Sequence, residues 1–220
     1  MQYFDDAEII FFPGTEESII DATNGDIHKI NLPQGWAGTK RISQNSDENY
    51  CAISDEKKIL IVKKNGEVSS TIRCPGLIPL GIAFIKGTNN IIVFYNNGDI
   101  YWYTRKGEFI KKSEASVYYN YSDDAYFEFD NDTKNIYVQM NKLTDVIDIE
   151  SGVEIAHLLQ CFGYHKPSDT FITESYDADR NIKVGYYKRY TVDELITKAK
   201  DILQGAELSD ELKSQYGIED

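Results

Sequence analysis

The chain of 220 residues lacks the features that mark several protein classes. It has only three cysteines and three histidines, and no CxxC, HxH or HExxH spacing, which argues against a zinc site or a histidine-based metal site. Basic residues are outnumbered, with 23 Lys and Arg against 36 Asp and Glu. The resulting net charge of −13 argues against nucleic-acid binding, which needs a basic face.

Long apolar runs are also missing, since none approaches the ~18 residues that a membrane-spanning helix requires. The N-terminal sequence MQYFDDAEII has neither the charged segment nor the apolar stretch of a secretory signal. We therefore expect a cytoplasmic protein that binds neither membrane nor nucleic acid. Its cysteines, Cys51, Cys74 and Cys161, are expected to be buried free thiols.

The chain does contain many short apolar and aromatic runs, because 41% of its residues are hydrophobic and 16 are tyrosine. The stretch from Gly81 to Lys112 shows the pattern most clearly. Its four apolar runs are Gly81–Ile85, Ile91–Tyr95, Asp99–Tyr103 and Glu108–Lys111. Turn signals separate them, including Asn97-Gly98, a strong hairpin signal. This pattern predicts a four-stranded antiparallel meander, which is the unit of a β-propeller blade.

The same unit recurs 73 positions earlier, where Ile9–Ile30 aligns with Ile82–Tyr103 without a gap. Nine of the 22 aligned positions are identical, and both glycine turns are in register. An offset of 73 is close to two blade periods of roughly 40 residues. The alternative is two unrelated hairpins that share common turn chemistry.

Five blade-like units follow one another along the chain. The predicted strands of unit one are Glu8–Phe12, Ser18–Thr23, Asp26–Asn31 and Gly38–Ser43, and those of unit two are Tyr50–Ser54, Lys58–Lys63 and Glu67–Arg73. Unit three is the stretch from Gly81, unit four has Ala125–Phe129, Asn135–Met140, Asp145–Ile149 and Val153–Leu159, and unit five has Phe162–His165, Thr170–Tyr176 and Ile182–Tyr190. Units two and five are one strand short.

The hydrophobic period then changes from that of a strand to that of a helix. Thr191–Leu203 has apolar residues at 3–4 spacing, and Thr191 with Glu194 forms a capping box. A second short helix is predicted at about Asp210–Gln215. We therefore divide the chain into β-blades over residues 1–190 and a helical tail over residues 191–220, docked on the last blade because short helices need packing.

Three segments resemble bacterial WD40-like and YVTN-like propeller repeats. FDNDTKNIYVQM (Phe129–Met140) is similar to the turn between a blade's first two strands, and VIDIESGVEIAHL (Val146–Leu158) to the hairpin between its last two. The segment Tyr190–Ile218 resembles the helical tail that closes many such proteins. The matching tail positions are Asp193, Glu194, Leu195, Ile196, Ala199, Leu208, Ser209, Glu211 and Tyr216.

The resemblance implies an all-β propeller of about 4–5 blades with a short C-terminal helical tail. One possible architecture is a small closed propeller, in which Gln2–Phe4 completes unit five as its outer strand. The other is the C-terminal half of a larger propeller, which would favour self-association because open strand edges need covering. Family members are often the sensor halves of bacterial signalling NTPases and caspase-like effectors.

Motifs for catalysis are absent from the sequence, which has no GxSxG, no phosphate-cradling glycine loop and no Cys with a placed His. We therefore expect neither enzymatic activity nor a cofactor. The acidic clusters Asp130-Asn131-Asp132 and Asp177-Ala178-Asp179 could offer oxygens to Ca²⁺, but both fall where hairpin turns are predicted. We interpret them as turns and predict no metal site.

The candidate binding residues are aromatic and lie in or beside the long loop between units three and four. They are Tyr118, Tyr119, Tyr121 and Tyr126, next to Phe127. Tyrosine suits protein and sugar interfaces because it combines apolar area with a polar tip, although blade packing would also use aromatics. Trp36 and Trp102 are assigned to the core.

These features favour a non-enzymatic module that binds a protein partner through one propeller face. Its expected setting is a sensor or scaffold in a bacterial signalling or defence system. The alternative is a propeller that binds a small ligand or carbohydrate between blades. A propeller hydrolase is a third possibility, and the fold alone does not decide among them.

Overall fold

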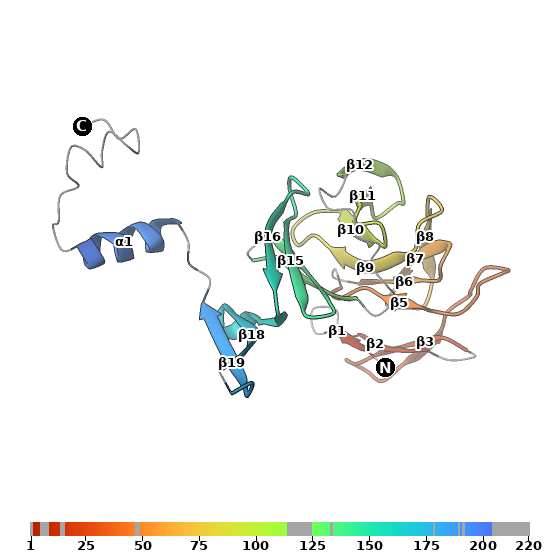
Figure 1. Ribbon diagram of the computed structural model, residues 1–220. Helices are drawn as coiled ribbons and strands as arrows, with labels where there is room; N and C mark the ends of the chain where they lie inside the picture. The colour runs from red at the N-terminus through yellow and green to blue at the C-terminus, as the bar shows by residue number, and fades with distance from the viewer. Residues whose placement is uncertain are drawn as a thin grey trace. The chain divides into compact units, whose positions relative to one another are not determined.

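A computed structural model describes residues 2–4, 9–13, 16–46, 49–113, 125–132, 134–177, 179–188, 190 and 192–203. The chain divides into two compact units, Met1–Gly163 and Tyr164–Asp220. Figure 1 shows the elements of both units along the chain.

The first unit contains four antiparallel sheets, each a four-stranded meander whose strands lie side by side in chain order. Sheet A consists of β1 (Gln2–Phe4), β2 (Ile9–Phe12), β3 (Ser18–Asp21) and β4 (Ile27–Lys29). Sheet B consists of β5 (Arg41–Ile42), β6 (Tyr50–Ser54), β7 (Lys58–Lys63) and β8 (Val68–Arg73). Sheet C consists of β9 (Pro79–Phe84), β10 (Asn90–Tyr95), β11 (Ile100–Thr104) and β12 (Phe109–Ser113), and sheet D of β13 (Tyr126–Asp130), β14 (Asn135–Met140), β15 (Leu143–Asp148) and β16 (Glu154–Leu159).

The second unit contains sheet E and one helix. Sheet E has three strands, β17 (Cys161–His165), which begins in the first unit, β18 (Thr170–Tyr176) and β19 (Ile182–Lys188). A 3₁₀ segment, η2 (Lys166–Ser168), joins β17 to β18. The helix α1 (Val192–Leu203) follows β19. The predicted all-β class with a short helix near the C-terminal end is therefore confirmed.

Two strand assignments made from the sequence are wrong. The strand within Gly38–Ser43 pairs with β6, so it opens sheet B instead of closing sheet A, and it supplies the strand that unit two lacked. Its hydrogen bonds run from Lys40 N to Ser54 O and from Ser43 N to Ala52 O, 2.7 Å each. Gln2–Phe4 pairs with β2 in sheet A, so it does not complete sheet E. Local turn signals in the sequence do not determine with which neighbouring strand each of these two strands forms its hydrogen bonds.

Consecutive sheets in the first unit pack face to face around three hydrophobic cores. Between sheets A and B lie Ile9, Phe11, Ile19, Ile30, Cys51, Ile53, Leu60 and Val62. Between B and C lie Ala52, Ile59, Ile61, Ile72, Ile82, Phe84, Ile91, Val93, Tyr95 and Tyr103. Between C and D lie Leu80, Ala83, Ile92, Phe94, Ile100, Trp102, Phe127, Ile136, Val138, Ile147 and Ile149.

This packing explains why the middle strands of sheets B and C are apolar throughout. In β7 the four residues Ile59–Val62 are all buried, and in β10 the run Ile91–Tyr95 is buried as well. Alternate side chains of each strand enter the cores on opposite faces, since successive residues point to opposite sides of a sheet. Each buried Ile, Leu or Phe stabilises the fold by about 1.5–3 kcal/mol.

Three hairpins of the first unit share one turn geometry with glycine as the last loop residue. Gly66, Gly98 and Gly107 have φ of 80°, 87° and 84°. In the β10–β11 hairpin, Gly98 N donates to Tyr95 O and Tyr95 N donates to Asp99 O, 2.9 Å each. This is the three-residue loop that ends in a left-handed residue, where glycine avoids the Cβ clash. The hairpin predicted at Asn97-Gly98 is confirmed, with Gly98 alone at positive φ.

The two copies of the 73-residue sequence repeat occupy sheets A and C, but their strand pairing differs by one residue. Phe11 pairs with Ile19 in sheet A. In sheet C the corresponding Phe84 pairs with Ile91, one residue before the position equivalent to Ile19. Duplication of a common unit therefore stays a prediction.

The helix α1 begins one residue after the predicted capping residue Thr191. Leu195 and Ile196 on this helix are 52% and 46% exposed, and Lys188 Nζ lies 3.4 Å from Glu194 Oε1. Docking of the helix on the last sheet stays a prediction, and the second predicted helix lies outside the described residues.

No helix in the described part of the chain is long and apolar enough to cross a bilayer. The cytoplasmic location also stays a prediction.

The Gly98 turn provides a direct test of this hairpin geometry. Gly98→Val should lower the free energy of unfolding by more than about 1 kcal/mol, because a β-branched residue resists positive φ. Urea denaturation followed by circular dichroism measures the change. Gly98→Asn is the matched control, since asparagine tolerates the left-handed conformation and should cost less. Equal stability of Gly98→Val and the wild type would contradict the assigned turn.

Candidate functional site

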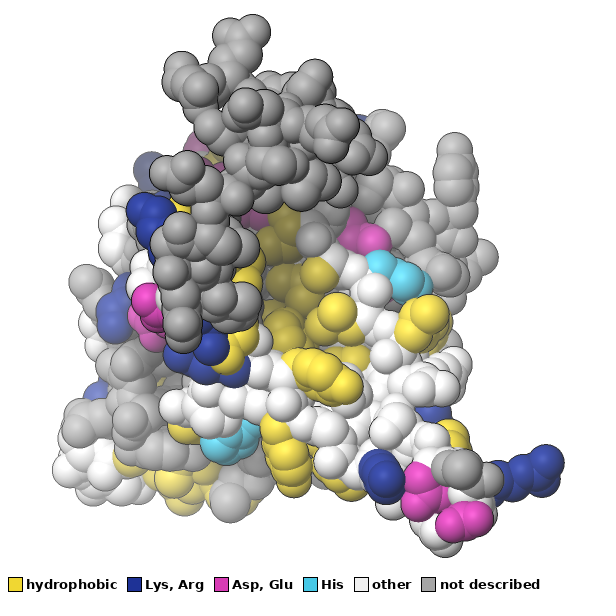
Figure 2. Space-filling view, turned by 60° about the vertical axis from the view of Figure 1, so that its left-hand side comes forward, with side chains coloured by type: hydrophobic (Ala, Val, Ile, Leu, Met, Phe, Trp, Pro, Cys, Tyr) yellow, Lys and Arg dark blue, Asp and Glu magenta, His cyan; other side chains and the backbone are white. Residues whose placement is uncertain are grey.

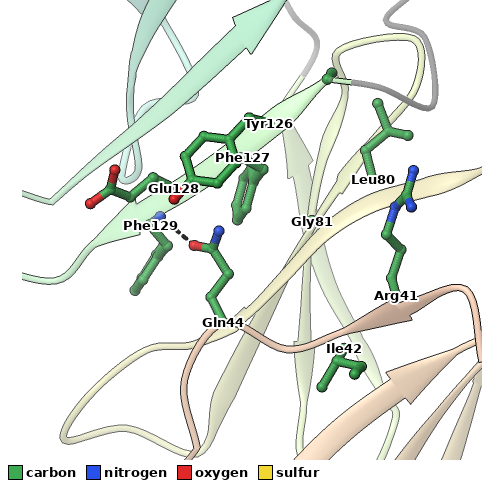
Figure 3. A pocket seen from close by; sticks show the side chains of 10 residues that line it. Arg41, Ile42, Gln44, Leu80, Gly81, Tyr126, Phe127, Glu128 and Phe129 are labelled. Atoms are coloured by element: carbon green, nitrogen blue, oxygen red, sulfur yellow. Dashed lines mark hydrogen bonds between the residues drawn. The ribbon is translucent and has the colours of Figure 1, made fainter. Parts of the chain in front are cut away.

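The main candidate site is a pocket where the first strands of sheets B, C and D come together. It has a volume of about 510 Å³. Its lining residues are Arg41, Ile42, Gln44, Leu80, Gly81, Ala125, Tyr126, Phe127, Glu128 and Phe129. Figure 3 shows Tyr126 and Phe127 on one side of the pocket, with Arg41 and Leu80 on the other. We call it the first-strand pocket.

Side chains from the segment after β5 hold the edges of the first strands together. Gln44 N donates to Ile82 O on β9 at 2.9 Å, while Gln44 Oε1 accepts a hydrogen bond from Phe129 N on β13 at 2.6 Å (Figure 3). Asn45 Nδ2 donates to Phe84 O at 2.8 Å, and Asn45 Oδ1 accepts from Phe84 N at 2.7 Å. Both amides thereby satisfy backbone groups at strand edges, which otherwise offer unpaired donors and acceptors.

The lining of the pocket includes a phenol, a guanidinium and a carboxylate, which belong to Tyr126, Arg41 and Glu128. Tyr126 is 59% exposed and so presents its ring to solvent. Partial burial of its hydroxyl, and secondly the charge of Glu128, raise the pKa of Tyr126. Arg41 Nη1 donates to Lys40 O at 3.3 Å, and the side chain extends from β5 toward Leu80 (Figure 3). These groups can recognise a ligand through hydrogen bonds and charge.

The apolar side of the pocket is formed by the contact between β9 and β13. Phe127 is 4% exposed, and its ring stacks on Phe94 with centroids 5.7 Å apart. Gly81 lies directly beneath this ring, since a Cβ at that position would lie 2.3 Å from Phe127 Cγ. The absence of a side chain at Gly81 therefore allows Phe127 to lie against β9.

Of the four tyrosines that the sequence singled out, Tyr126 lines the first-strand pocket. Tyr118, Tyr119 and Tyr121 lie outside the described residues. Sequence reasoning did not identify Arg41, Gln44, Leu80 or Glu128. No local motif marks them, because three sheets far apart in the chain must pack before these residues meet.

Apolar and charged side chains are both exposed on the surface. Figure 2 shows hydrophobic side chains next to Lys, Arg, Asp and Glu side chains. A hydrophobic lining with a few placed polar groups, as in the first-strand pocket, is typical of ligand pockets.

A second group of polar residues lies on β15 and β16. His157 Nδ1 lies 2.6 Å from Asp145 Oδ1 and 4.0 Å from Glu154 Oε1. The three ligand atoms are within 4.8 Å of one another, and one imidazole with two carboxylates is a set that divalent metals accept. Glu154 Oε2 is buried and has no hydrogen-bond partner in the described part of the chain. The hydrogen-bonded Asp145–His157 pair accounts for this group without an ion, so we assign no metal to it.

The remaining sequence candidates have structural roles. Asp177 Oδ1 accepts hydrogen bonds from Asp179 N and Asn181 N, at 3.0 and 2.9 Å, which is the geometry of a polar turn. Trp102 is 4% exposed, and Trp36 is partly buried against the core between sheets A and B.

The free thiols are also confirmed. Cys51 and Cys161 are buried, Cys74 is partly buried, and none is in a disulfide. Burial raises the pKa of Cys51 to about 12 and that of Cys74 to about 11. Both thiols are therefore protonated and unreactive at neutral pH.

Comparison with known proteins identifies a fold and no activity. No family model matches the chain, and no curated protein matches it. A crystal structure of a protein of unknown function from Bacteroides caccae matches with a TM-score of 0.52 and 14% identity, over 82% of this chain and 72% of that one. In all, 855 solved chains match, so the architecture is common and restricts the function little.

The close approach of Gly81 to Phe127 predicts a specific steric sensitivity. Gly81→Ala should lower the free energy of unfolding by about 1–3 kcal/mol, because the added Cβ overlaps the aromatic ring. Gly163→Ala is the control, since its Cβ would meet Gln139 Oε1 at an ordinary 3.5 Å. Thermal unfolding measures both variants. The double variant Gly81→Ala/Phe127→Leu should cost less than the sum of the two single changes.

The environment of Glu154 predicts a pH-dependent stability. Burial first, and the Asp145 carboxylate second, raise the pKa of Glu154 above 4.5. The folded state therefore holds the proton more tightly, and this stabilisation is complete below pH 4.5 and is lost as the pH rises through the folded-state pKa. Glu154→Gln should thus stabilise the protein at pH 7 by less than about 1 kcal/mol, and this gain should vanish below pH 4.5.

Urea denaturation at pH 4 and pH 7 measures this difference, with Glu56→Gln as the control for removing one exposed negative charge. A gain for Glu154→Gln that is the same at both pH values would contradict a raised Glu154 pKa.

Proposed function

We propose that the sheets are successive blades of a β-propeller of about 4–5 blades. The proposal is supported by the order of the strands, since each sheet is a meander of consecutive strands. It is also supported by the three face-to-face cores between neighbouring sheets. In a propeller the first strands of the blades line the central channel, and here β5, β9 and β13 line one pocket. The closed ring in which Gln2–Phe4 completes the last blade is ruled out because this strand pairs with β2, and half of a larger ring is the alternative that stays open.

On this architecture we assign the chain the role of a non-enzymatic module that binds a protein partner. The observation that supports it best is the exposed Tyr126 on one side of the first-strand pocket, with Arg41 on the opposite side (Figure 3). Tyrosine and arginine are enriched among the residues that contribute most to protein interfaces. Leu80 and Phe127 provide apolar surface below them for a side chain of the partner. A volume of about 510 Å³ suits a short segment or loop of that partner.

The sensor setting rests on the resemblance of the sequence to bacterial propeller repeats. In such proteins the propeller recognises a partner and an attached domain acts on it. The present chain would supply the recognition half of a signalling or defence protein in the cytoplasm. Its net charge of −13 favours a partner with a basic or neutral contact surface over a nucleic acid.

Peptide selection tests this role and does not require the partner in hand. A random peptide library displayed on phage is selected on the wild-type protein, and the affinity of the selected peptides is measured for variants. Tyr126→Ala should weaken binding at least about tenfold, as expected for a central aromatic contact. Arg41→Ala should weaken it as well.

Tyr186→Ala provides the matched control, because Tyr186 is 71% exposed on sheet E and does not line the first-strand pocket. This variant should bind the selected peptides with wild-type affinity. Selected peptides that bind Tyr126→Ala and Arg41→Ala as tightly as the wild type would refute a binding role for this pocket. Thermal unfolding of each variant separates lost binding from lost folding.

A further inference from the structure

A second pocket lies between sheets C and D and differs from the first-strand pocket in its charge. Its volume is about 560 Å³. The lining residues are Ile85, Lys86, Thr88, Asn90, Trp102, Lys111, Phe129, Asn131, Asp132, Lys134, Ile149 and Glu150. Among the described lining residues, Phe129 alone is shared with the first-strand pocket. We call it the lysine pocket.

Three lysines converge on this pocket in a protein that is otherwise strongly acidic. Among the described lining residues, the three lysines Lys86, Lys111 and Lys134 outnumber the two carboxylates Asp132 and Glu150, so this part of the lining carries an excess of positive charge. Lys134 Nζ forms an ion pair with Glu150 Oε1, and this carboxylate raises the pKa of Lys134. The charge of Glu150 is thereby matched, which leaves Lys86, Lys111 and the single carboxylate of Asp132 as the other charged side chains of the described lining.

The ammonium group of Lys111 is held in place by contacts that leave its charge uncompensated. Lys111 Nζ lies 4.4 Å from the centre of the Trp102 ring and donates to Glu150 O at 2.8 Å. The ring face and the carbonyl oxygen orient the ammonium but carry no net charge. Over the described ranges, neither Lys111 nor Lys86 forms an ion pair with a carboxylate. One oriented ammonium group, that of Lys111, and one exposed lysine, Lys86, both without a carboxylate partner among the described residues, favour an anionic ligand.

The other lining groups suit a ligand that carries hydroxyl groups on a compact ring. The side-chain amide of Asn90 makes no hydrogen bond with a described residue, and Asn131 uses its Oδ1 to accept from Lys86 N at 3.1 Å. The Nδ2 groups of both asparagines can therefore donate to a ligand. Ile85, Phe129 and Ile149 provide an apolar wall against which the C–H face of a ring can pack.

From these features we propose that the lysine pocket binds a sugar acid, a monosaccharide-sized ligand with hydroxyl groups and one carboxylate. Lys86 and Lys111 would contact the carboxylate, and Asn90 and Asn131 would donate to hydroxyl oxygens. The site does not rest on the proposed protein-binding role, because its charged and amide groups belong to residues that do not line the first-strand pocket. The pocket lies between two sheets. This is the position at which the alternative hypothesis from the sequence expected a small ligand or a carbohydrate to bind.

The protein contains its own reporter for this site. Trp36 and Trp102 are its two tryptophans, and Trp102 lines the lysine pocket. Titration of Trp36→Phe with D-glucuronate should give a saturable change in tryptophan fluorescence. Isothermal titration calorimetry of the wild type measures the same binding without relying on that variant. D-Glucose and acetate are the matched control ligands. Glucose has the hydroxyl groups and the ring but no carboxylate, and acetate has the carboxylate but no hydroxylated ring.

Lys111→Gln and Lys86→Gln should each weaken glucuronate binding about tenfold, because each removes a charge-assisted contact. Lys57→Gln is the matched control, since Lys57 is an exposed lysine on a turn of sheet B, and it should bind as the wild type does. Binding should also weaken as salt is raised. The proposal is overturned by an absence of saturable glucuronate binding, by glucose or acetate binding equally well, or by wild-type affinity in both lysine variants.

Discussion

Face-to-face packing between consecutive sheets is the interaction on which the rest of this structure depends. Sheets B and C have a neighbouring sheet on both faces, and so their middle strands are buried on both sides. The runs KILIVK in β7 and NIIVFY in β10 supply apolar side chains for two cores at once. If sheet B or sheet C were isolated from its neighbours, both of its hydrophobic faces would be exposed to water. The stability of each sheet therefore depends on the sheets packed against it.

The same packing brings the edges of the first strands together and creates a surface there. Strand edges carry unpaired backbone groups, and Gln44 and Asn45 satisfy several of them across β9 and β13. The bonds position Phe129, and with it the neighbouring Tyr126 and Phe127. The first-strand pocket is thus a consequence of how the edges are closed, and its recognition groups lie on a rigid frame.

The two pockets differ in the chemistry of their described lining residues. The first-strand pocket combines an exposed aromatic ring with mixed charge, which suits a segment of a protein. The lysine pocket has an excess of positive charge and amide donors, which suits a small anionic ligand. Both use side chains from sheets C and D, and Phe129 on β13 lines both. Ligands bound in both pockets would therefore lie on either side of Phe129.

The sequence by itself determined the strands, the glycine turns, the all-β class and the helix after the last sheet, because these follow from local periodicity and from residues such as Gly98. It also pointed to Tyr126. Only the tertiary structure decided that β5 opens sheet B, that β1 pairs with β2, and that Arg41 and Lys111 line pockets. Strand partners and pocket linings join residues far apart in the chain, and a local pattern carries no information about such contacts.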